Sequence, residues 1–405
     1  MGLLKIKMEA NIFNKSNYIE LSNIGRYQYF IFCALVLYFT VPHHLLANTV
    51  GLSELKAFDL MVPFVVIMYL FCKVNISKLL PVFALGMLYL IRSFFALDDI
   101  GPISMVYALK FLEYAIVIFC IKDLRPIFAH KLIRIYIFFI FTYICLEFLG
   151  VNIGLLWDGR FTGHFGGPYE LSAIALLFFF FYKTNYLMKA LFLIVIFLSG
   201  TKAAYIALVI GLAFKSDIKN LLPAFFLGTI FLYLVILFDP RFSDFISNLS
   251  YIANADIFYQ TWSNIPKIDS HAVYMEYFYS RESEATDSSV DLSSFSRLYT
   301  YLIILKSIDL SVFFFGHGPG FFGSAVDSSI LRIFGETGVF GLFALYFALK
   351  KLSEHYELNI STILTIVAII ALSDVLFSAR FLVTLALLNQ LTLYKENSPQ
   401  QKKYG

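Results

Sequence analysis

The chain has 405 residues and a net charge of +3 at pH 7, with 59% hydrophobic and only 15% charged residues. Soluble domains carry roughly 25% charged residues, so this composition excludes an ordinary soluble protein and predicts an integral membrane protein. The net charge gives no indication that the protein binds nucleic acid.

Most of the chain consists of apolar segments long enough to cross a membrane. A transmembrane helix needs about 20 mostly apolar residues, which predicts an all-α polytopic membrane protein. The candidate spans are approximately 28–48, 55–72, 79–97, 103–121, 132–150, 169–182, 220–238, 328–349, 359–377 and 380–394.

Segment 190–214 can form one span or two short helices, and the charges around it distinguish the two. Membrane proteins keep Lys and Arg in cytoplasmic loops. Two helices, 190–199 and 202–214, joined at Ser199-Gly200-Thr201-Lys202, leave every basic loop inside. This interpretation predicts about 12 spans with both termini cytoplasmic. Helices this short reach only about 15–20 Å, so we expect Lys202 at the floor of a wet depression open to the outside.

The domain organisation follows from these spans. The first residues carry cations but no apolar signal region or cleavage site, so they are not a secretory signal. The predicted order is a cytoplasmic N-terminal tail (1–27), transmembrane helices 1–9 (28–238), a large periplasmic loop (239–326), transmembrane helices 10–12 (327–394) and a cytoplasmic tail (395–405).

The loop 239–326 is the long polar segment of the chain, with ten acidic and five basic residues interleaved with aromatic residues. Rings beside carboxylates suit sugars, which stack on rings and bond to acids. A loop anchored on the membrane interface by aromatic residues would look similar, and both interpretations stay open. Residues 295–310 predict an amphipathic helix capped by Ser293 or Ser294. Arg297 would lie in its first turn, where the helix dipole strengthens an anion site.

A glycine-rich turn, Gly316-His317-Gly318-Pro319-Gly320, follows this helix, and glycines let backbone amides approach a ligand. His317 is a candidate base, although a histidine in a turn is more often structural. The next span begins at Asp327 and contains Glu336. Ionisable residues in spans are usually functional, because burying one costs several kcal/mol. Arg332 lies four residues before Glu336, and mutual neutralisation would give both a structural role.

A further glycine-rich segment, 159–168, carries Arg160 and precedes the span 169–182. Arg160, Lys202 and Arg297 are thus three cations in turns or short helices on an otherwise acidic outer face. We interpret them as ligands of a polyanion, and diphosphate is the natural polyanion for a membrane enzyme.

The sequence indicates neither a metal nor a cofactor. Its four cysteines lie in or at the ends of spans, and it has no Cys-x-x-Cys pair, no His-Glu-x-x-His motif and no Walker motif. Zinc and ATP sites are therefore not expected.

Together these features resemble the superfamily of O-antigen polymerases and ligases, which are bacterial membrane glycosyltransferases of the C type. The resemblance covers about residues 155–350. It rests on the Arg160 segment, the Ser-Gly-Thr-Lys hairpin where the family usually has Ser-Gly-Ser-Arg, Arg297, and Gly-His-Gly-Pro-Gly followed by Asp327 and Gly-Glu-Thr-Gly. Lys202 keeps the charge of the usual arginine but loses its bidentate geometry. Asp327 stands where ligases have a His-Asn pair, so the polymerase branch (Wzy) is the better match.

The resemblance implies a GT-C-like polymerase of undecaprenyl-diphosphate-linked oligosaccharide on the periplasmic face of the bacterial inner membrane. A chain-length regulator protein would be a further partner. Within that reaction we assign Arg160, Lys202 and Arg297 to the diphosphate. The base or acceptor-positioning residue would be Asp327 or Glu336, with His317 as the weaker candidate.

Two other functions stay open. An O-antigen ligase would transfer polymer to lipid A core and needs a histidine near residue 327, where His317 is the available one. A flippase or transporter of the lipid-linked sugar would also bind diphosphate, but it would normally lack an outer loop of 88 residues.

Overall fold

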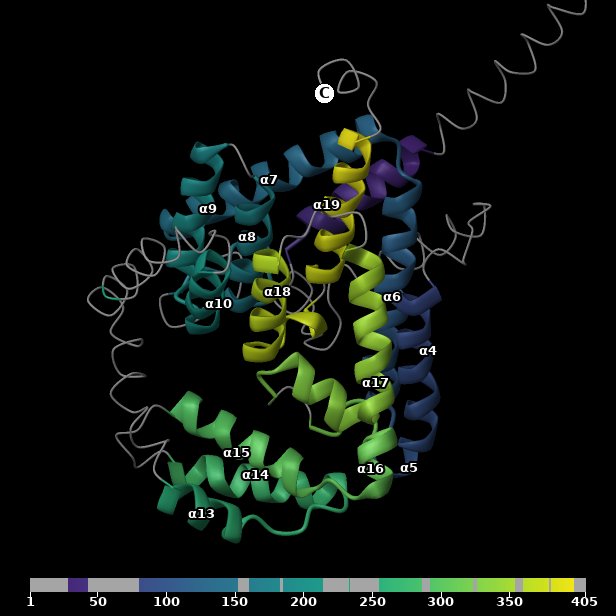
Figure 1. The fold of residues 1–405 in the computed structure, drawn as a ribbon, viewed down its shortest axis with the longest axis vertical. Helices are drawn as coiled ribbons and strands as arrows, with labels where there is room; N and C mark the ends of the chain where they lie inside the picture. The colour runs from purple at the N-terminus through teal and green to yellow at the C-terminus, as the bar shows by residue number, and fades with distance from the viewer. Residues whose placement is uncertain are drawn as a thin grey trace, which may run out of the picture.

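All elements in the described part of the chain are helical, which confirms the predicted all-α fold (Figure 1). Among these residues three helices are long and apolar enough to cross a membrane: α6 (Ile103–Asp123), α7 (Pro126–Phe148) and α17 (Ser329–Ser353). The computed structural model describes residues 28–42, 80–151, 160–182, 185–213, 233, 255–285, 292–322, 326–353, 360–378 and 380–396.

Shorter apolar helices make up the rest of the bundle, which is consistent with a membrane protein. They are the helix Gln28–Thr40, α4 (Leu80–Phe95), α8 (Pro168–Phe181), α9 (Tyr186–Ser199), α10 (Lys202–Ala213), α18 (Ile360–Leu372) and α19 (Phe381–Glu396). Nearly all of the predicted spans 55–72 and 220–238 lies outside the described residues. Helix α7 begins six residues before the expected position 132, with Pro126 in its first turn, where proline is favoured.

The prediction of two helices in 190–214 is confirmed. Helix α9 ends at Ser199 and α10 begins at Lys202, with Gly200 between them at φ 56°. This left-handed conformation closes a helix C-terminus at little cost only for glycine, and the Gly200 N–H donates to the carbonyl of Phe197.

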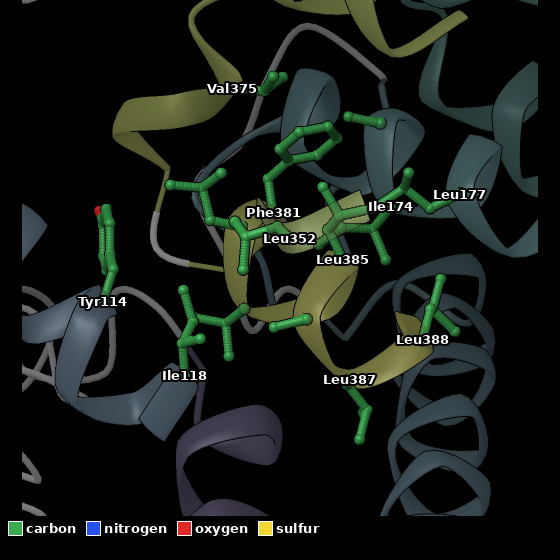
Figure 2. Close-up of a cluster of buried hydrophobic side chains, with 14 of the residues drawn as sticks. Tyr114, Ile118, Ile174, Leu177, Leu352, Val375, Phe381, Leu385, Leu387 and Leu388 are labelled. Carbon is green, nitrogen blue, oxygen red and sulfur yellow. The ribbon is translucent and has the colours of Figure 1, made fainter. Parts of the chain in front are cut away.

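Helix α19 lies at the centre of the bundle. Every residue from Phe381 to Leu391 is buried, as expected for a helix that is apolar on all sides. Figure 2 shows Phe381 and Leu385 among the side chains that α6 contributes, including Ile118, and those that α8 contributes, including Ile174. This packing places the start of α19 beside both helices.

The preceding helix ends earlier than expected. The predicted span 359–377 ends as α18 at Leu372, followed by the short 3₁₀ helix η3 (Val375–Phe377). Residues 373–378 therefore form an irregular segment after an apolar helix. Irregular backbone at membrane depth occurs only where protein or water surrounds it, so this segment is a candidate place for a functional site.

Three helices of the predicted loop form a layer at one end of the bundle: α13 (Ala255–Asn264), α14 (His271–Ala285) and α15 (Leu292–Lys306), drawn in green (Figure 1). The layer packs on the short helix α5 (Leu97–Ile100) through a second apolar cluster that includes Ile100, Ile268 and Phe322. The Asp99 carboxylate also accepts the backbone N–H of His271 at 3.1 Å. These contacts fix the layer to the end of α4 and α6.

The start of α15 corrects one prediction. The helix begins at Leu292, so Ser293 and Ser294 lie inside it rather than at its cap. Arg297 therefore lies in the second turn, beyond the amides that point freely from a helix start. The side chain of Arg297 is outside the described residues, and its assignment to diphosphate stays a prediction.

The glycine-rich turn after α16 (Leu310–Phe315) packs against a kink in α17. Gly338, inside α17, has φ 66° and interrupts the helix there. A Cβ at Gly338 would lie 2.3 Å from the backbone of Phe314, and one at Gly316 would lie 2.2 Å from the backbone of Glu336. Only glycine permits this approach of the two segments.

We expect Gly338→Ala to destabilise the protein clearly more than Gly150→Ala. Both glycines have positive φ, which costs an L-residue about 1–2 kcal/mol. At Gly150 a Cβ meets nothing within 4 Å, whereas at Gly338 it meets backbone, and overpacking adds about 1–3 kcal/mol. Thermal unfolding of the purified variants measures the difference, and equal losses of stability would contradict the close packing.

Candidate functional site

A cluster of buried charges lies at the start of α17. The Arg332 Nε donates to Glu336 Oε1 at 3.1 Å, and its Nη1 donates to Asp374 Oδ2 at 2.6 Å. Asp374 comes from the irregular segment 373–378, so the cluster joins two distant parts of the chain. The predicted contact between Arg332 and Glu336 is confirmed, but Arg332 contacts a second carboxyl group as well.

Aromatic rings hold the Arg332 guanidinium in place. Its Cζ lies 3.9 Å from the centre of the Phe377 ring and 4.8 Å from that of Tyr107. Cations are attracted to ring faces, and the attraction is stronger when water is excluded. Arg332 is only 2% exposed, so its side chain is fixed both by ion pairs and by the rings.

Asp327 and Tyr169 extend the cluster to a partly exposed edge. Asp327 interacts electrostatically with Asp374, and the hydroxyl of Tyr169 lies in the field of both carboxylates. Asp327 is partly exposed, whereas Glu336 is completely buried. Of the two carboxylates predicted as base, Asp327 is thus the one that a substrate can reach.

The Arg160 segment lies against the tip of the α9–α10 hairpin. The backbone N–H of Phe161 donates to the carbonyl of Leu198 at 3.2 Å. Lys202, the first residue of α10, follows Leu198 by four positions and is partly exposed, as Arg160 is. The structure therefore brings the segments that carry two of the three predicted cations together.

Carboxylates hold the Arg160 segment in this position. Glu147, near the end of α7, accepts the N–H of Thr162 at 3.0 Å and that of Gly163 at 2.8 Å. Glu170, in the first turn of α8, accepts the N–H of Gly166 at 2.7 Å. A carboxylate that accepts hydrogen bonds from several backbone N–H groups holds a turn more firmly than a neutral acceptor does.

Arg380, directly before α19, connects this turn to the part of the chain that carries Asp374. Its backbone N–H donates to Glu170 at 3.1 Å, and its guanidinium donates to the carbonyl of His164 at 3.0 Å and to the carbonyls of Tyr38 and Val41. Arg380 is completely buried. The Arg160 segment and the Asp374 segment are thus held by one network.

The glycine-rich turn does not present its amides to a ligand. The N–H groups of His317 and Gly318 donate to the carbonyls of Gly335 and Glu336, and that of Gly320 donates to the Glu336 carboxylate at 2.9 Å. The expectation that these amides approach a ligand is therefore wrong. They are used in attaching the turn to the kinked part of α17.

His317 lies in this turn and stacks on Phe321, with 4.2 Å between the ring centres. Burial lowers the pKa of His317 from 6.5 to about 4, against the smaller opposing effects of Asp309 and Asp99. The imidazole is therefore neutral at pH 7. A neutral histidine can accept a proton, but so low a pKa makes it a weak base at that pH.

We expect His317 to make folding stability depend on acidity between pH 6.5 and 4. Its pKa is lower in the folded protein than in the unfolded chain, so the unfolded chain binds the extra proton first. The stabilisation that its burial brings is complete above pH 6.5 and is lost as the pH falls toward 4. The stability difference between the wild type and His317→Gln should therefore shrink over this range in thermal unfolding. A difference that does not vary with pH, or one that shrinks equally for exposed His130→Gln, would contradict this.

Sequence reasoning missed Asp374, Glu170 and Arg380. All three are ionisable residues within or beside predicted spans, and such residues are rarely placed there without a partner. That signal was present in the sequence, but it did not show which residues pair. In the described part of the chain, no group of three His, Cys, Asp or Glu side chains is arranged to hold a metal ion.

The fold and the site together define a helical protein with apolar helices of membrane-spanning length and a buried charge network beside its polar helical layer. Comparisons with protein-family models, with curated proteins and with solved structures find no match to this chain.

Proposed function

We propose that this protein is a membrane glycosyltransferase of the O-antigen polymerase type. It would join undecaprenyl-diphosphate-linked oligosaccharide repeat units on the periplasmic face of the bacterial inner membrane. The observation that carries the proposal is the position of α8. Its preceding segment brings Arg160 to the Lys202 hairpin, and its first turn brings Tyr169 to Asp327 and Asp374. The segment 160–169 thus has the two cations beside its start and the two carboxylates beside its end.

In the proposed reaction the acceptor hydroxyl oxygen forms a bond to the anomeric carbon of the donor sugar, and the bond from that carbon to the diphosphate oxygen breaks. Asp327 takes the hydroxyl proton, which contributes about 10²–10⁴ in rate for a general base. Arg160 and Lys202 offset the charge of the departing diphosphate, which is often the larger contribution. Arg297, on α15, is proposed as a third ligand of that group.

In the proposed orientation, the layer of α13, α14 and α15 faces the periplasm and both chain termini are cytoplasmic. The aromatic and acidic residues of this layer, including the exposed Tyr259 and Asp256, suit the oligosaccharide that extends from the lipid. A chain-length regulator protein would act from the same side.

Loss of the gene in its native strain tests the function through the banding pattern of surface polysaccharide. Single capped repeats in place of long chains support a polymerase. Absence of surface repeats would instead mean that the lost protein is a flippase. Polymer that is not attached to lipid A core would mean that the lost protein is a ligase. Either of these results would overturn the proposal.

We expect cysteines at Gln260 and Lys202 to react with an impermeant thiol reagent from the periplasmic side, and a cysteine at Lys131 not to react. Gln260 lies exposed on α13, Lys202 is partly exposed, and Lys131 is exposed near the start of α7. Labelling is measured in spheroplasts, in a background with the four native cysteines replaced by serine. Reaction at Lys131 but not at Gln260 would invert the proposed orientation.

A further inference from the structure

The buried cluster at the start of α17 has more negative than positive charge. One guanidinium, that of Arg332, faces two carboxylates, those of Asp374 and Glu336. Arg332 is 2% exposed, the Asp374 side chain 15% and Glu336 0%. Burying an unbalanced charge is costly unless the group is neutralised.

The hydrogen bonds show which carboxylate is the surplus one. Asp374 has the short contact to Arg332 Nη1, and the Ser329 hydroxyl, which is 3.1 Å from the Ser373 carbonyl, lies 3.4 Å from the other Asp374 oxygen. Glu336 receives both of its hydrogen bonds, from Arg332 and from the Gly320 N–H, on the single oxygen Oε1. Its other oxygen, Oε2, is buried and without a partner among the described residues.

A buried hydroxyl lies in the electrostatic field of Glu336. Tyr89, on α4, is 0% exposed, and its hydroxyl interacts with the Glu336 side chain but makes no hydrogen bond of regular geometry in the described part of the chain. An ionised carboxylate oxygen without a donor is unfavourable in such a place, whereas a protonated one can donate to an oxygen.

Within the described residues, the ion pairs of the Asp374 and Glu336 carboxyl groups are both with Arg332. Arg92, on α4, donates to the carbonyl of Gly316 at 2.7 Å. Lys110, on α6, has its Nζ 5.2 Å from the centre of the Tyr107 ring, the ring that Arg332 also contacts. Asp327 adds a negative charge beside Asp374.

We propose that Glu336 carries a proton on Oε2 at neutral pH, shared with the Tyr89 hydroxyl, so that Arg332 forms its ion pair with Asp374 alone. The cluster is then electrically neutral, with the Glu336 carboxylic acid accepting from Arg332 and Gly320 through Oε1. This protonation site does not depend on the proposed glycosyltransferase function.

Infrared spectroscopy of the purified protein in lipid nanodiscs at pH 7 tests the proposal, because the carbonyl stretch of a protonated carboxyl group is separate from that of a carboxylate. Glu336→Gln should remove one protonated-carboxyl band from the wild-type spectrum. Asp374→Asn should remove the same band, because Arg332 then pairs with an ionised Glu336. Tyr89→Phe should keep the band but shift it to higher frequency, because the hydrogen bond is lost.

Glu170→Gln is the matched control. Glu170 is as buried as Glu336, but each of its oxygens accepts a backbone N–H, from Gly166 and from Arg380, so no band should disappear. Persistence of the full band in Glu336→Gln would overturn the proposal, and so would its persistence in Asp374→Asn. Size-exclusion chromatography shows that each variant is folded before its spectrum is compared. Tyr89→Phe, which removes one oxygen only, keeps the test valid if a charge variant fails to fold.

Discussion

Asp327→Asn is expected to lower polymerisation by at least about 100-fold while lipid-linked substrate still binds. A general base must accept a proton, whereas a residue that only positions the acceptor needs an acceptor oxygen. Asparagine keeps the oxygen and the size of Asp327 and removes the basicity. Polymer formed by membrane vesicles from added lipid-linked repeat units measures the rate, and crosslinking of a substrate analogue measures binding.

Glu336→Gln is the control for this experiment, and its loss of activity should be much smaller. Glu336 is fully buried and bonded to Arg332 and Gly320, so it cannot reach a sugar hydroxyl. Glutamine also reproduces the shape and charge of a protonated Glu336. Full activity of Asp327→Asn would exclude Asp327 as the base, and equal losses in both variants with poor membrane insertion would make both residues structural.

Lys202→Ala is expected to reduce polymerisation by about 10–100-fold at a normal protein level. Removing a charged hydrogen-bond partner costs about 1.5–3 kcal/mol, and each 1.4 kcal/mol is about tenfold. Lys202→Arg should keep much of the activity, because the charge stays and the guanidinium fork suits phosphate. The same vesicle assay, with protein amounts matched by immunoblotting, gives the comparison.

Lys131→Ala is the matched control, since Lys131 is an exposed lysine near the start of α7 and is not one of the predicted site residues. It should polymerise as the wild type does. Normal activity of Lys202→Ala would mean that the hairpin tip anchors the protein at the membrane interface and that the diphosphate binds elsewhere.

Local patterns in the sequence were sufficient to predict most helices. The split of 190–214 followed from charge placement and a glycine, and the structure has the break at Gly200. The start of α15 was predicted too late because Ser293 and Ser294 were interpreted as caps. Serine favours helix caps but is also tolerated inside a helix. The early end of α18 at Leu372 was missed because residues 359–377 are mostly apolar and contain a single charged residue, Asp374.

Pairings between residues far apart in the chain could not be predicted from the sequence. Arg332 and Glu336 are four apart on one helix, a spacing that predicts contact, and their side chains do lie in contact at 3.1 Å. Asp374 lies 42 positions from Arg332, and Glu170 lies 210 positions from Arg380. Periodicity carries no information about such contacts, since they depend on how the helices pack. The candidate site was therefore predicted as separate residues and not as a network.

The shortness of helix α9 links this protein to the thickness of its membrane. Both ends of α9 lie within the described residues, and the helix has 14 residues, or about 21 Å, against a hydrocarbon core of about 30 Å. Ile194 on α9 is an exposed apolar residue that would face lipid. A helix shorter than the hydrocarbon core is accommodated by local thinning of the bilayer, by flanking residues that reach the interface or by oligomerisation, at a cost that rises with each ångström of mismatch. Lipids with shorter acyl chains reduce this mismatch. We therefore expect the stability of the α9–α10 hairpin to depend on the lipid composition of the membrane.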